Sequence, residues 1–273
     1  MCASINVGLP GFGGRMGQMI AKLINEDNLF NVTAATEVAN SNLIGLDIAY
    51  NLGVPNTGVQ ISAYPNVLGE NSDVIIDFTE PKATMAHLQI ALETNTPMVI
   101  GTTGLNQTQE KQISNAAKII PIIYCANTSI GVTILLQQVR QIASKLEDSW
   151  DIEILETHHN EKIDAPSGTA LALGNAAANG RSVSLMDVRD NVRDGNVGPR
   201  KHGNIGFSVL RGGNVAGEHS VIFFGKDERI ELVHKANDRV IFARGALKAA
   251  QFVVKKSKQN DLKGYFTMDD VLG

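Results

Sequence analysis

A short segment near the middle of the chain gathers side chains that can transfer a proton and bind an anion. Residues 156–170 read ETHHNEKIDAPSGTA and include His158, His159 and Lys162. Histidine titrates near neutral pH and can act as a general acid, and lysine supplies a fixed positive charge or a proton. The Pro-Ser-Gly-Thr run predicts a helix start, where the amides of Gly168 and Thr169 would favour an anion. The segment therefore indicates acid chemistry on an anionic substrate, most simply one that carries carboxylates.

Three other interpretations of this segment explain fewer of its residues. His158 and His159 could bind zinc as a pair, but the segment has no cysteine and no H-E-x-x-H spacing. They could be exposed histidines at a strand end, which leaves Lys162 and the helix start without a role. Ser167 could be a nucleophile, but no G-x-S-x-G turn surrounds it. We therefore predict no metal site and no serine nucleophile.

A second group of residues, near the N-terminus, fits a dinucleotide. Gly11, Gly14 and Gly17 lie in GFGGRMG, between an apolar run and a helical pattern. Glycines there allow a tight turn and the close approach of a pyrophosphate to a helix N-terminus. Taken alone, the loop is a weak signal, because a tight turn from a strand into a helix also needs glycines for purely structural reasons. Glu37, at the end of the next predicted strand, favours the cofactor interpretation because a carboxylate there can bind a ribose diol.

The neighbours of Glu37 bear on which nicotinamide cofactor is used. Val38 follows it, so no adjacent cation offsets the repulsion between the carboxylate and a 2′-phosphate. Arg15 is a cation in the glycine loop that could reach such a phosphate. We expect NADH to serve at least as well as NADPH.

Two further segments follow predicted strands and belong with the same site. They are GTTG at residues 101–104 and CANT at residues 125–128. Ligands of open α/β sheets lie outside the carboxyl ends of the strands, where small residues let a nicotinamide approach the backbone. GTTG is also explained as a simple turn.

The elements that must position these residues alternate in the first half of the chain. Strands are predicted at residues 5–9, 32–36, 74–77, 98–101 and 119–124, and helices at residues 15–26, 82–93 and 107–117. Near-continuous apolar strands that alternate with helices predict an α/β fold with a doubly wound parallel sheet.

The pattern changes near Asn127. Helices are predicted at residues 130–146 and 170–178, and strands at residues 151–157, 205–210, 219–224 and 229–236. Strands that follow one another without helices predict an α+β domain with a largely antiparallel or mixed sheet. Residues 181–204 show no clear periodicity, and the last predicted element is a helix at residues 241–257.

Composition excludes several classes of protein. A length of 273 residues suggests two domains, and a net charge of −4 with 5% aromatic residues argues against nucleic-acid binding. The chain has no run of 18 apolar residues, so no membrane helix is predicted. The N-terminus lacks the pattern of a secretory signal. Cys2 and Cys125 cannot form a disulfide framework; one bridge between them is possible in principle, but a reduced cytoplasmic setting fits better.

Seven segments of the chain resemble the dihydrodipicolinate reductases, also called 4-hydroxy-tetrahydrodipicolinate reductases. They are GFGGRMG, DFTEP, IGTTG, CANTSIGV, EILETHHNEKIDAPSGTA, GEHSVIFF and ELVHKANDR. The H-H-x-x-K-x-D-A-P-S-G-T-A run is specific to that family, whereas the glycine loop is not. The resemblance covers nearly the whole chain.

The resemblance implies a fold and a reaction. Residues 1–126 and 239–273 would form a Rossmann-type domain, and residues 127–238 a substrate domain whose open mixed sheet mediates a homotetramer. The chain would cross between them at residues 129–131 and 237–239. NADH or NADPH would deliver a hydride to C4 of a cyclic unsaturated dicarboxylate, 4-hydroxy-tetrahydrodipicolinate. Loss of the 4-hydroxyl as water would give tetrahydrodipicolinate, in diaminopimelate and lysine synthesis.

The resemblance also implies roles for single residues. His158 aligns with the proton donor, and Lys162 with a companion donor that also binds a carboxylate. His159, Gly168 and Thr169 align with substrate contacts. The positions that align with cofactor contacts are Gly11, Phe12, Gly13, Gly14, Arg15, Met16, Glu37, Gly101, Thr102, Thr103, Cys125, Ala126, Asn127 and Thr128.

Two positions depart from the family pattern. Val38 stands where many members carry arginine, and Glu80 where some carry a basic residue. Both departures weaken the case for a strong preference for NADPH, and neither touches the substrate segment.

Two other functions share part of this pattern. A different two-domain dehydrogenase, acting on a sugar or an amino-acid semialdehyde, would share the glycine loop and Glu37. It would not need His158, Lys162 and the helix start in one segment. A nucleotide-sensing protein would keep the Rossmann domain and lose the proton donors. The spacing leaves open how proton donation is divided between His158 and Lys162.

Overall fold

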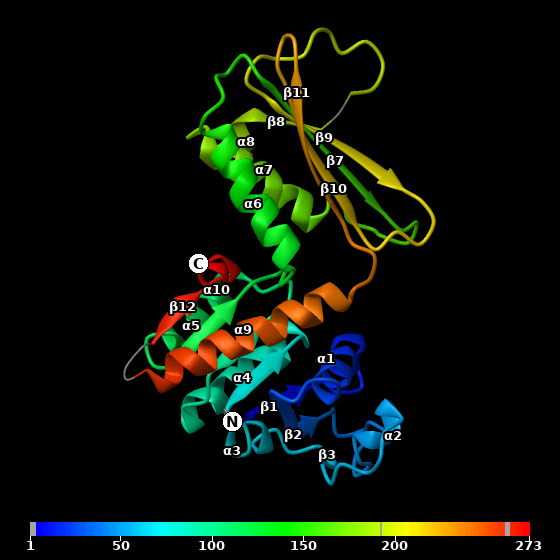
Figure 1. Cartoon of the computed structure of the whole chain (residues 1–273), viewed down its shortest axis with the longest axis vertical. Coiled ribbons are helices and arrows are strands. Elements are labelled where there is room, and N and C mark those ends of the chain that lie inside the picture. Colours follow the sequence, from blue (N-terminus) through cyan, green and yellow to red (C-terminus); the bar gives the residue numbers. More distant parts are fainter. Residues whose placement is uncertain (1–3, 192, 260–262) are drawn as a thin grey trace. The chain divides into compact units, whose positions relative to one another are not determined.

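The structure is a computed structural model that describes residues 4–191, 193–259 and 263–273, so Cys2 lies outside the described residues. Its contacts divide the chain into two compact units (Figure 1). The first unit is Met1–Thr128 with Val240–Gly273, and the second is Ser129–Arg239. The domain boundaries predicted from the sequence lie at residues 126/127 and 238/239.

The first unit is built on a seven-stranded sheet in the order β12-β6-β5-β4-β1-β2-β3, and all its pairs are parallel. The strands are β1 (Ile5–Pro10), β2 (Phe30–Thr36), β3 (Ile61–Ser62), β4 (Val74–Asp77), β5 (Met98–Ile100), β6 (Pro121–Tyr124) and β12 (Gly264–Phe266). Because β1 lies between β2 and β4, the winding of the chain reverses there. Such a reversal opens a crevice at the carboxyl ends of the strands.

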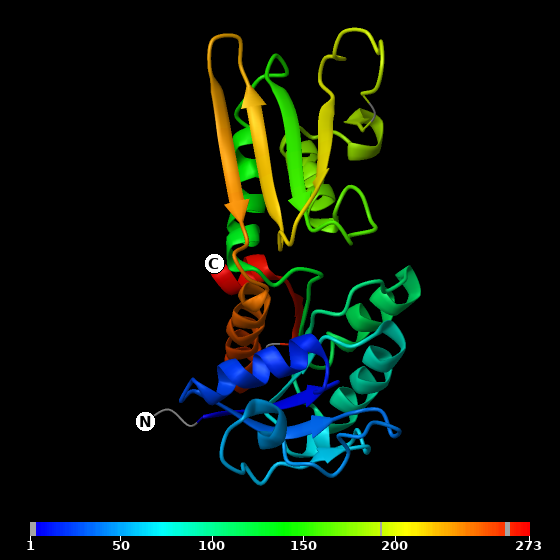
Figure 2. The same cartoon turned by 90° about the vertical axis from the view of Figure 1, so that its right-hand side faces the viewer.

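Helices cover both faces of this sheet (Figure 2). One face carries α1 (Arg15–Asn25) and α9 (Val240–Lys258), and the other α3 (Val67–Glu70), α4 (Pro81–Thr94) and α5 (Gln107–Ala116). Every residue of β4 is buried, as expected for a strand enclosed on both faces. The predicted doubly wound parallel sheet is confirmed. The remaining helices of this unit are the short α2 (Ala49–Leu52) and α10 (Met268–Leu272).

The second unit has a five-stranded mixed sheet in the order β11-β10-β7-β9-β8. The strands are β7 (Asp151–His158), β8 (Arg189–Asp190), β9 (Ile205–Arg211), β10 (Glu218–Phe224) and β11 (Arg229–Lys235). β7, β9 and β8 run parallel, whereas β10 runs antiparallel to β7 and β11. The sheet is therefore mixed, and the predicted second α+β domain is confirmed.

Helices cover only one face of the mixed sheet. These are α6 (Ile130–Ala143), α7 (Gly168–Gly180) and α8 (Leu185–Val188), and the opposite face is open in the described part of the chain (Figure 2). Burial alternates strictly along β7, with Ile152, Ile154, Glu156 and His158 toward the helices. The strand therefore turns a glutamate and a histidine into the covered side of the sheet.

The predicted helices and strands are present with ends that differ by a few residues, but the C-terminal prediction is incomplete. Beyond α9, β12 pairs with β6 and adds an outer strand to the first sheet. The short elements α2, β3, α3, α8, β8 and α10 also escaped prediction. Two to five residues are too few for a hydrophobic period, and short strands become strands only through their partners.

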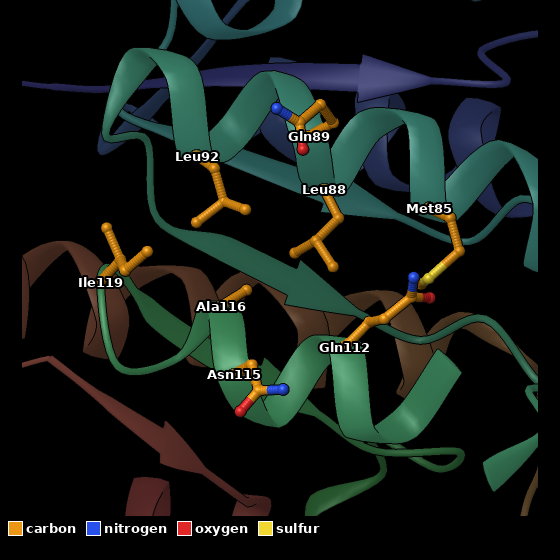
Figure 3. A pocket seen from close by; sticks show the side chains of 8 residues that line it. All are labelled: Met85, Leu88, Gln89, Leu92, Gln112, Asn115, Ala116 and Ile119. Atoms are coloured by element: carbon orange, nitrogen blue, oxygen red, sulfur yellow. The ribbon is translucent and has the colours of Figure 1, made fainter. Parts of the chain in front are cut away.

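No helix in the described ranges is long and apolar enough to span a membrane. A groove lies between α4 and α5 on the first unit (Figure 3). Its walls are Met85, Leu88, Gln89, Leu92, Gln112, Asn115, Ala116 and Ile119. None of these side chains titrates near neutral pH, so the groove is no candidate for proton chemistry.

Candidate active site

The predicted cofactor residues of the first unit all follow the carboxyl ends of parallel strands. The glycine loop follows β1, Glu37 follows β2, residues 101–103 follow β5 and residues 125–128 follow β6. Because neighbouring parallel strands end at the same edge of a sheet, the fold brings these segments to one edge.

The glycine loop is a tight turn that requires glycine at two positions. Gly11 has a φ of 63°, in the left-handed region that favours glycine. A Cβ at Gly17 would lie 2.7 Å from the carbonyl oxygen of Gly11. Phe12 is fully buried and its N–H donates to the carbonyl oxygen of Thr36. The turn itself therefore explains Gly11 and Gly17, as the structural interpretation of the loop expects.

Glu37 contacts the glycine loop directly. Its Oε1 accepts a hydrogen bond from the backbone N–H of Gly13 at 2.7 Å, and its Oε2 accepts one from Val38 at 3.1 Å. The carboxylate thus lies beside the loop and next to the exposed Val38 side chain. An acceptor in this place can bind a ribose diol.

A buried carboxylate at the end of β4, which the sequence analysis missed, organises two of these segments. Asp77 accepts hydrogen bonds from the N–H and Oγ1 of Thr79, at 2.8 and 2.6 Å, and from Oγ1 of Thr102 at 3.2 Å. Its Oδ2 lies 2.7 Å from Nδ1 of His87 on α4. Thr102 also accepts from Oγ1 of Thr84. The Thr102 side chain therefore holds the loop after β5 through buried hydrogen bonds. Only the backbone of Thr102 is left to contact a ligand.

The segment after β6 is held in a similar way. Burial raises the pKa of the Cys125 thiol to about 12, so this cysteine is a protonated small residue and no nucleophile. Oγ1 of Thr128 donates to the carbonyl oxygen of Phe242 at 2.7 Å. A Cβ at Gly101 would lie 2.1 Å from the Phe78 ring, so the β5 end also needs its glycine. Of the other predicted contacts, Gly14, Arg15, Thr103 and Ala126 are exposed, and Gly13, Met16 and Asn127 are half-buried.

In the second unit, the end of β7 and the start of α7 position the predicted substrate residues. His158 is the last residue of β7, and Gly168 and Thr169 are the first residues of α7. The Ser167 side chain caps α7 by accepting from the N–H of Ala170 at 3.1 Å. Apart from the two chain neighbours and the nearby backbone of α7 itself, no described atom lies within 4 Å of the place that a Cβ would take at Gly168. The helix start is therefore open to a ligand.

His158 is held by a buried glutamate. Its Nδ1 lies 2.5 Å from Oε2 of Glu156. A carboxylate only accepts hydrogen bonds, so the proton of this contact is on Nδ1 and Nε2 is left for chemistry. Burial lowers the pKa of His158 and outweighs the opposing effect of Glu156, and the charge of Lys162 lowers it further. The neutral ring therefore predominates near neutral pH.

Glu156, which had no predicted role, is fully buried and fully hydrogen bonded. Nη1 of Arg211 donates to Oε2 at 2.8 Å, Nη2 donates to Oε1 at 3.0 Å, and the N–H of Ser167 donates to Oε1 at 2.9 Å. Burial alone would raise the pKa of Glu156, but the bonds from Arg211, His158 and Ser167 outweigh it and lower that pKa. The carboxylate is therefore ionised.

Two more residues beside His158 escaped prediction. The His219 ring packs edge-on against it, with centroids 5.2 Å apart, and its Nε2 lies 3.1 Å from Oγ of Ser167. Burial lowers the pKa of His219 to about 4, so this ring is neutral. A Cβ at Gly217 would lie 3.0 Å from Nε2 of His158, so glycine there leaves room beside that atom.

Lys162 and His159 lie on the segment between β7 and α7. Nζ of Lys162 forms an ion pair with Oδ1 of Asp164 at 2.8 Å. His159 points its Nε2 toward Nη2 of Arg239, 3.5 Å away. Among the described residues, no three His, Cys, Asp or Glu side chains are grouped so that they could hold a metal ion.

Two family models match nearly the whole chain. The model of the "Dihydrodipicolinate reductase, N-terminus" matches residues 5–128, and that of the "Dihydrodipicolinate reductase, C-terminus" matches residues 131–272. The chain belongs to the dihydrodipicolinate reductase family. The family that the sequence resemblance indicated is confirmed.

Curated members of the dihydrodipicolinate reductase family are similar over their full length. A 4-hydroxy-tetrahydrodipicolinate reductase from Rhodopseudomonas palustris strain BisB5 is 48% identical over 265 residues, which cover 97% of this chain and 96% of that protein. One from Acinetobacter baumannii is 40% identical over 272 residues, with 99% of each chain covered.

Solved structures show the same fold. The dipicolinate-bound dihydrodipicolinate reductase from Paenisporosarcina sp. TG-14 has a TM-score of 0.73 and 22% identity, covering 97% of this chain and 98% of that one. The DAP dehydrogenase of C. glutamicum has a TM-score of 0.55 at 13% identity, covering 99% and 96%. The fold is thus shared with other dehydrogenases, and the side chains of the site must decide the reaction.

In this member of the dihydrodipicolinate reductase family, the residues that sequence analysis missed are those whose partners lie on other strands. Glu156 and His219 lie in segments that carry the resemblance. The alternation of side chains along a strand could have predicted that both point to the covered face of the sheet. Arg211 gives no signal in the sequence, because its contact with Glu156 depends on the pairing of β9 with β7.

Proposed function

We propose that the chain reduces 4-hydroxy-tetrahydrodipicolinate to tetrahydrodipicolinate with a reduced nicotinamide cofactor and releases water. One observation carries this proposal within the family: a glutamate-bound histidine lies next to a lysine and a capped, open helix start. Other dehydrogenases that share the fold do not need this combination of proton donor and anion contacts.

The first unit fits a nicotinamide dinucleotide. α1 begins at Arg15, its N-cap residue Gly14 provides no side-chain cap, and its first turn has no acidic residue, so its amide end can receive a pyrophosphate. Glu37, beside the glycine loop, would bind the adenosine ribose. Residues 101–103 and 125–128 would flank the nicotinamide. When bound, the cofactor supplies the hydride that adds to C4 of the ring.

The proton comes from the second unit. The 4-hydroxyl and a proton of the adjacent ring carbon would leave as water, and His158 would donate a proton from Nε2 to that same carbon when C4 has received the hydride. The substrate is a dicarboxylate, and its negative charge beside the ring favours the imidazolium form. Binding would therefore raise the lowered pKa of His158 and charge the donor only when substrate is present.

The remaining predicted residues would bind the two carboxylates. Lys162 is a compact cation whose present partner, Asp164, is half-exposed, so a substrate carboxylate can replace it. The amide end of α7 at Gly168 and Thr169 would bind an anion through the helix dipole. His159, near Arg239, would complete the site.

We further propose that NADH serves at least as well as NADPH, because the Glu37 carboxylate lies beside the uncharged Val38, which offers no cation to a 2′-phosphate. The open face of the mixed sheet supports a homotetramer. Leu210 and Val233 on that face expose 52% and 49% of their surfaces. The two units would act as cofactor and substrate domains in the cytoplasm, without nucleic-acid or membrane partners.

A coupled assay tests the reaction. Dihydrodipicolinate synthase, pyruvate and aspartate semialdehyde generate the substrate, and oxidation of NADH or NADPH is followed at 340 nm. We expect oxidation that depends on both enzymes and that pyridine-2,6-dicarboxylate inhibits in competition with the substrate. The absence of oxidation with both cofactors would rule out the proposed reaction.

A further inference from the structure

We infer that Glu156 and Arg211 form a positioning pair, which holds His158 in its Nδ1–H form and directs Nε2 to the substrate. This inference rests on the proposed function, because it assigns His158 the donation of a proton. Neither residue is a catalytic residue, since both act through His158.

The contacts of Glu156 leave it no freedom to turn. Its two oxygens accept from Arg211 twice, from the N–H of Ser167 and from Nδ1 of His158. The side chain has no exposed surface, so water cannot take the place of any partner. A carboxylate fixed in this way can only accept from Nδ1. The neutral His158 ring therefore carries its proton on Nδ1.

Arg211 links this pair to the substrate segment. It is the last residue of β9 and pairs in register with His158 on the neighbouring parallel strand. Besides Glu156, its Nη2 donates to the carbonyl oxygen of Asp164 at 2.7 Å. Asp164 is also the residue that binds Lys162. One guanidinium thus holds both the orienting carboxylate and the loop that carries the lysine.

The surroundings of Nε2 fit a donor directed outward. Gly217 has a φ of 152°, and a Cβ there would lie 3.0 Å from Nε2 of His158. Glycine is therefore needed to keep the space beside Nε2 open. A buried Glu–Arg pair that served only stability would not require this opening or the Nδ1 contact.

The decisive variant is Glu156→Gln. The glutamine amide can donate to Nδ1, which favours the opposite tautomer and opposes the imidazolium form. In serine proteases the corresponding Asp→Asn change lowers kcat about 10⁴-fold. Here we expect kcat to fall about 100-fold, which lies within the range that general acid catalysis usually contributes. The KM for NADH should stay within about twofold of the parent's value. The pH above which kcat/KM falls should move lower, because the imidazolium loses its carboxylate.

Matched variants separate positioning from general damage. Glu153→Gln also removes an arginine-bound carboxylate from β7, but on the opposite face, and should leave kcat and the pH profile unchanged. Arg211→Lys keeps the charge and loses the two-pronged contact, so a smaller loss of kcat is expected. In a His158→Ala background, Glu156→Gln should lower kcat less than about threefold. Equal losses in both backgrounds would overturn the inference.

A second readout does not need turnover. In protein labelled with ¹⁵N-histidine, the His158 signals are assigned by their loss in His158→Asn. Above neutral pH, Nδ1 should be protonated in the parent protein and Nε2 in Glu156→Gln. An unchanged tautomer would overturn the inference even if the enzyme is active. A parent protein with the expected tautomer but no NADH oxidation would instead refute the proposed function.

Discussion

Removing the Ser167 hydroxyl should lower the free energy of unfolding of the second unit by more than the loss of a helix cap alone would. Oγ of Ser167 accepts from the N–H of Ala170 and lies 3.1 Å from Nε2 of His219, and the residue is only 2% exposed. Ser167→Ala loses a cap worth about 1 kcal/mol and leaves Nε2 of His219 buried without a partner, at about 1–3 kcal/mol. The expected loss in the free energy of unfolding is therefore about 2–4 kcal/mol.

Urea unfolding, monitored by tryptophan fluorescence, measures this loss of stability in the second unit. Trp150 is the chain's single tryptophan, and it packs against the core of the second unit. Ser167→Thr keeps the hydroxyl and is the matched control, with an expected loss below about 1 kcal/mol. A loss below about 1 kcal/mol for Ser167→Ala would refute the reasoning, because the His219 contact would then contribute nothing.

Three further predictions concern the reaction. His158→Ala should lower kcat by about 10²–10⁴-fold, whereas Lys162→Ala should also raise the KM for the dicarboxylate; unchanged steady-state kinetics in both would contradict their roles. The kcat/KM of the parent should decline as pH rises from below 6.5, the ordinary pKa of histidine, because His158 must be protonated and its pKa in the free enzyme is lowered; a profile that rises with pH would contradict a proton donor. Val38→Arg should raise kcat/KM for NADPH relative to NADH, by about tenfold for a gain of 1.4 kcal/mol, and an unchanged ratio would contradict the electrostatic reasoning.

The sequence predicts most of the architecture because its signals are local. Apolar strands that alternate with amphipathic helices predict the parallel sheet, and the run of strands after residue 204 predicts the second one. β12 could not be predicted in this way, since three residues show no period and become a strand only by pairing with β6.

The same limit divides the candidate site. His158, Lys162 and the α7 start lie within one segment, so their types and spacing suffice to single them out. Arg211 and His219 reach that segment from β9 and β10, which flank β7. Their contacts depend on the order of the strands, which local patterns do not contain. Asp77 and His87 meet for a similar reason, because α4 packs back beside the strand that precedes it.

The transfer of deuterium tests the central claim most directly. The enzyme is given NADH with deuterium at both positions of the nicotinamide C4, and the product is analysed by mass spectrometry and NMR. We predict tetrahydrodipicolinate with one deuterium, bound to C4 of its ring. A product without deuterium at C4, or no product while the protein remains folded, would contradict hydride delivery to this dicarboxylate.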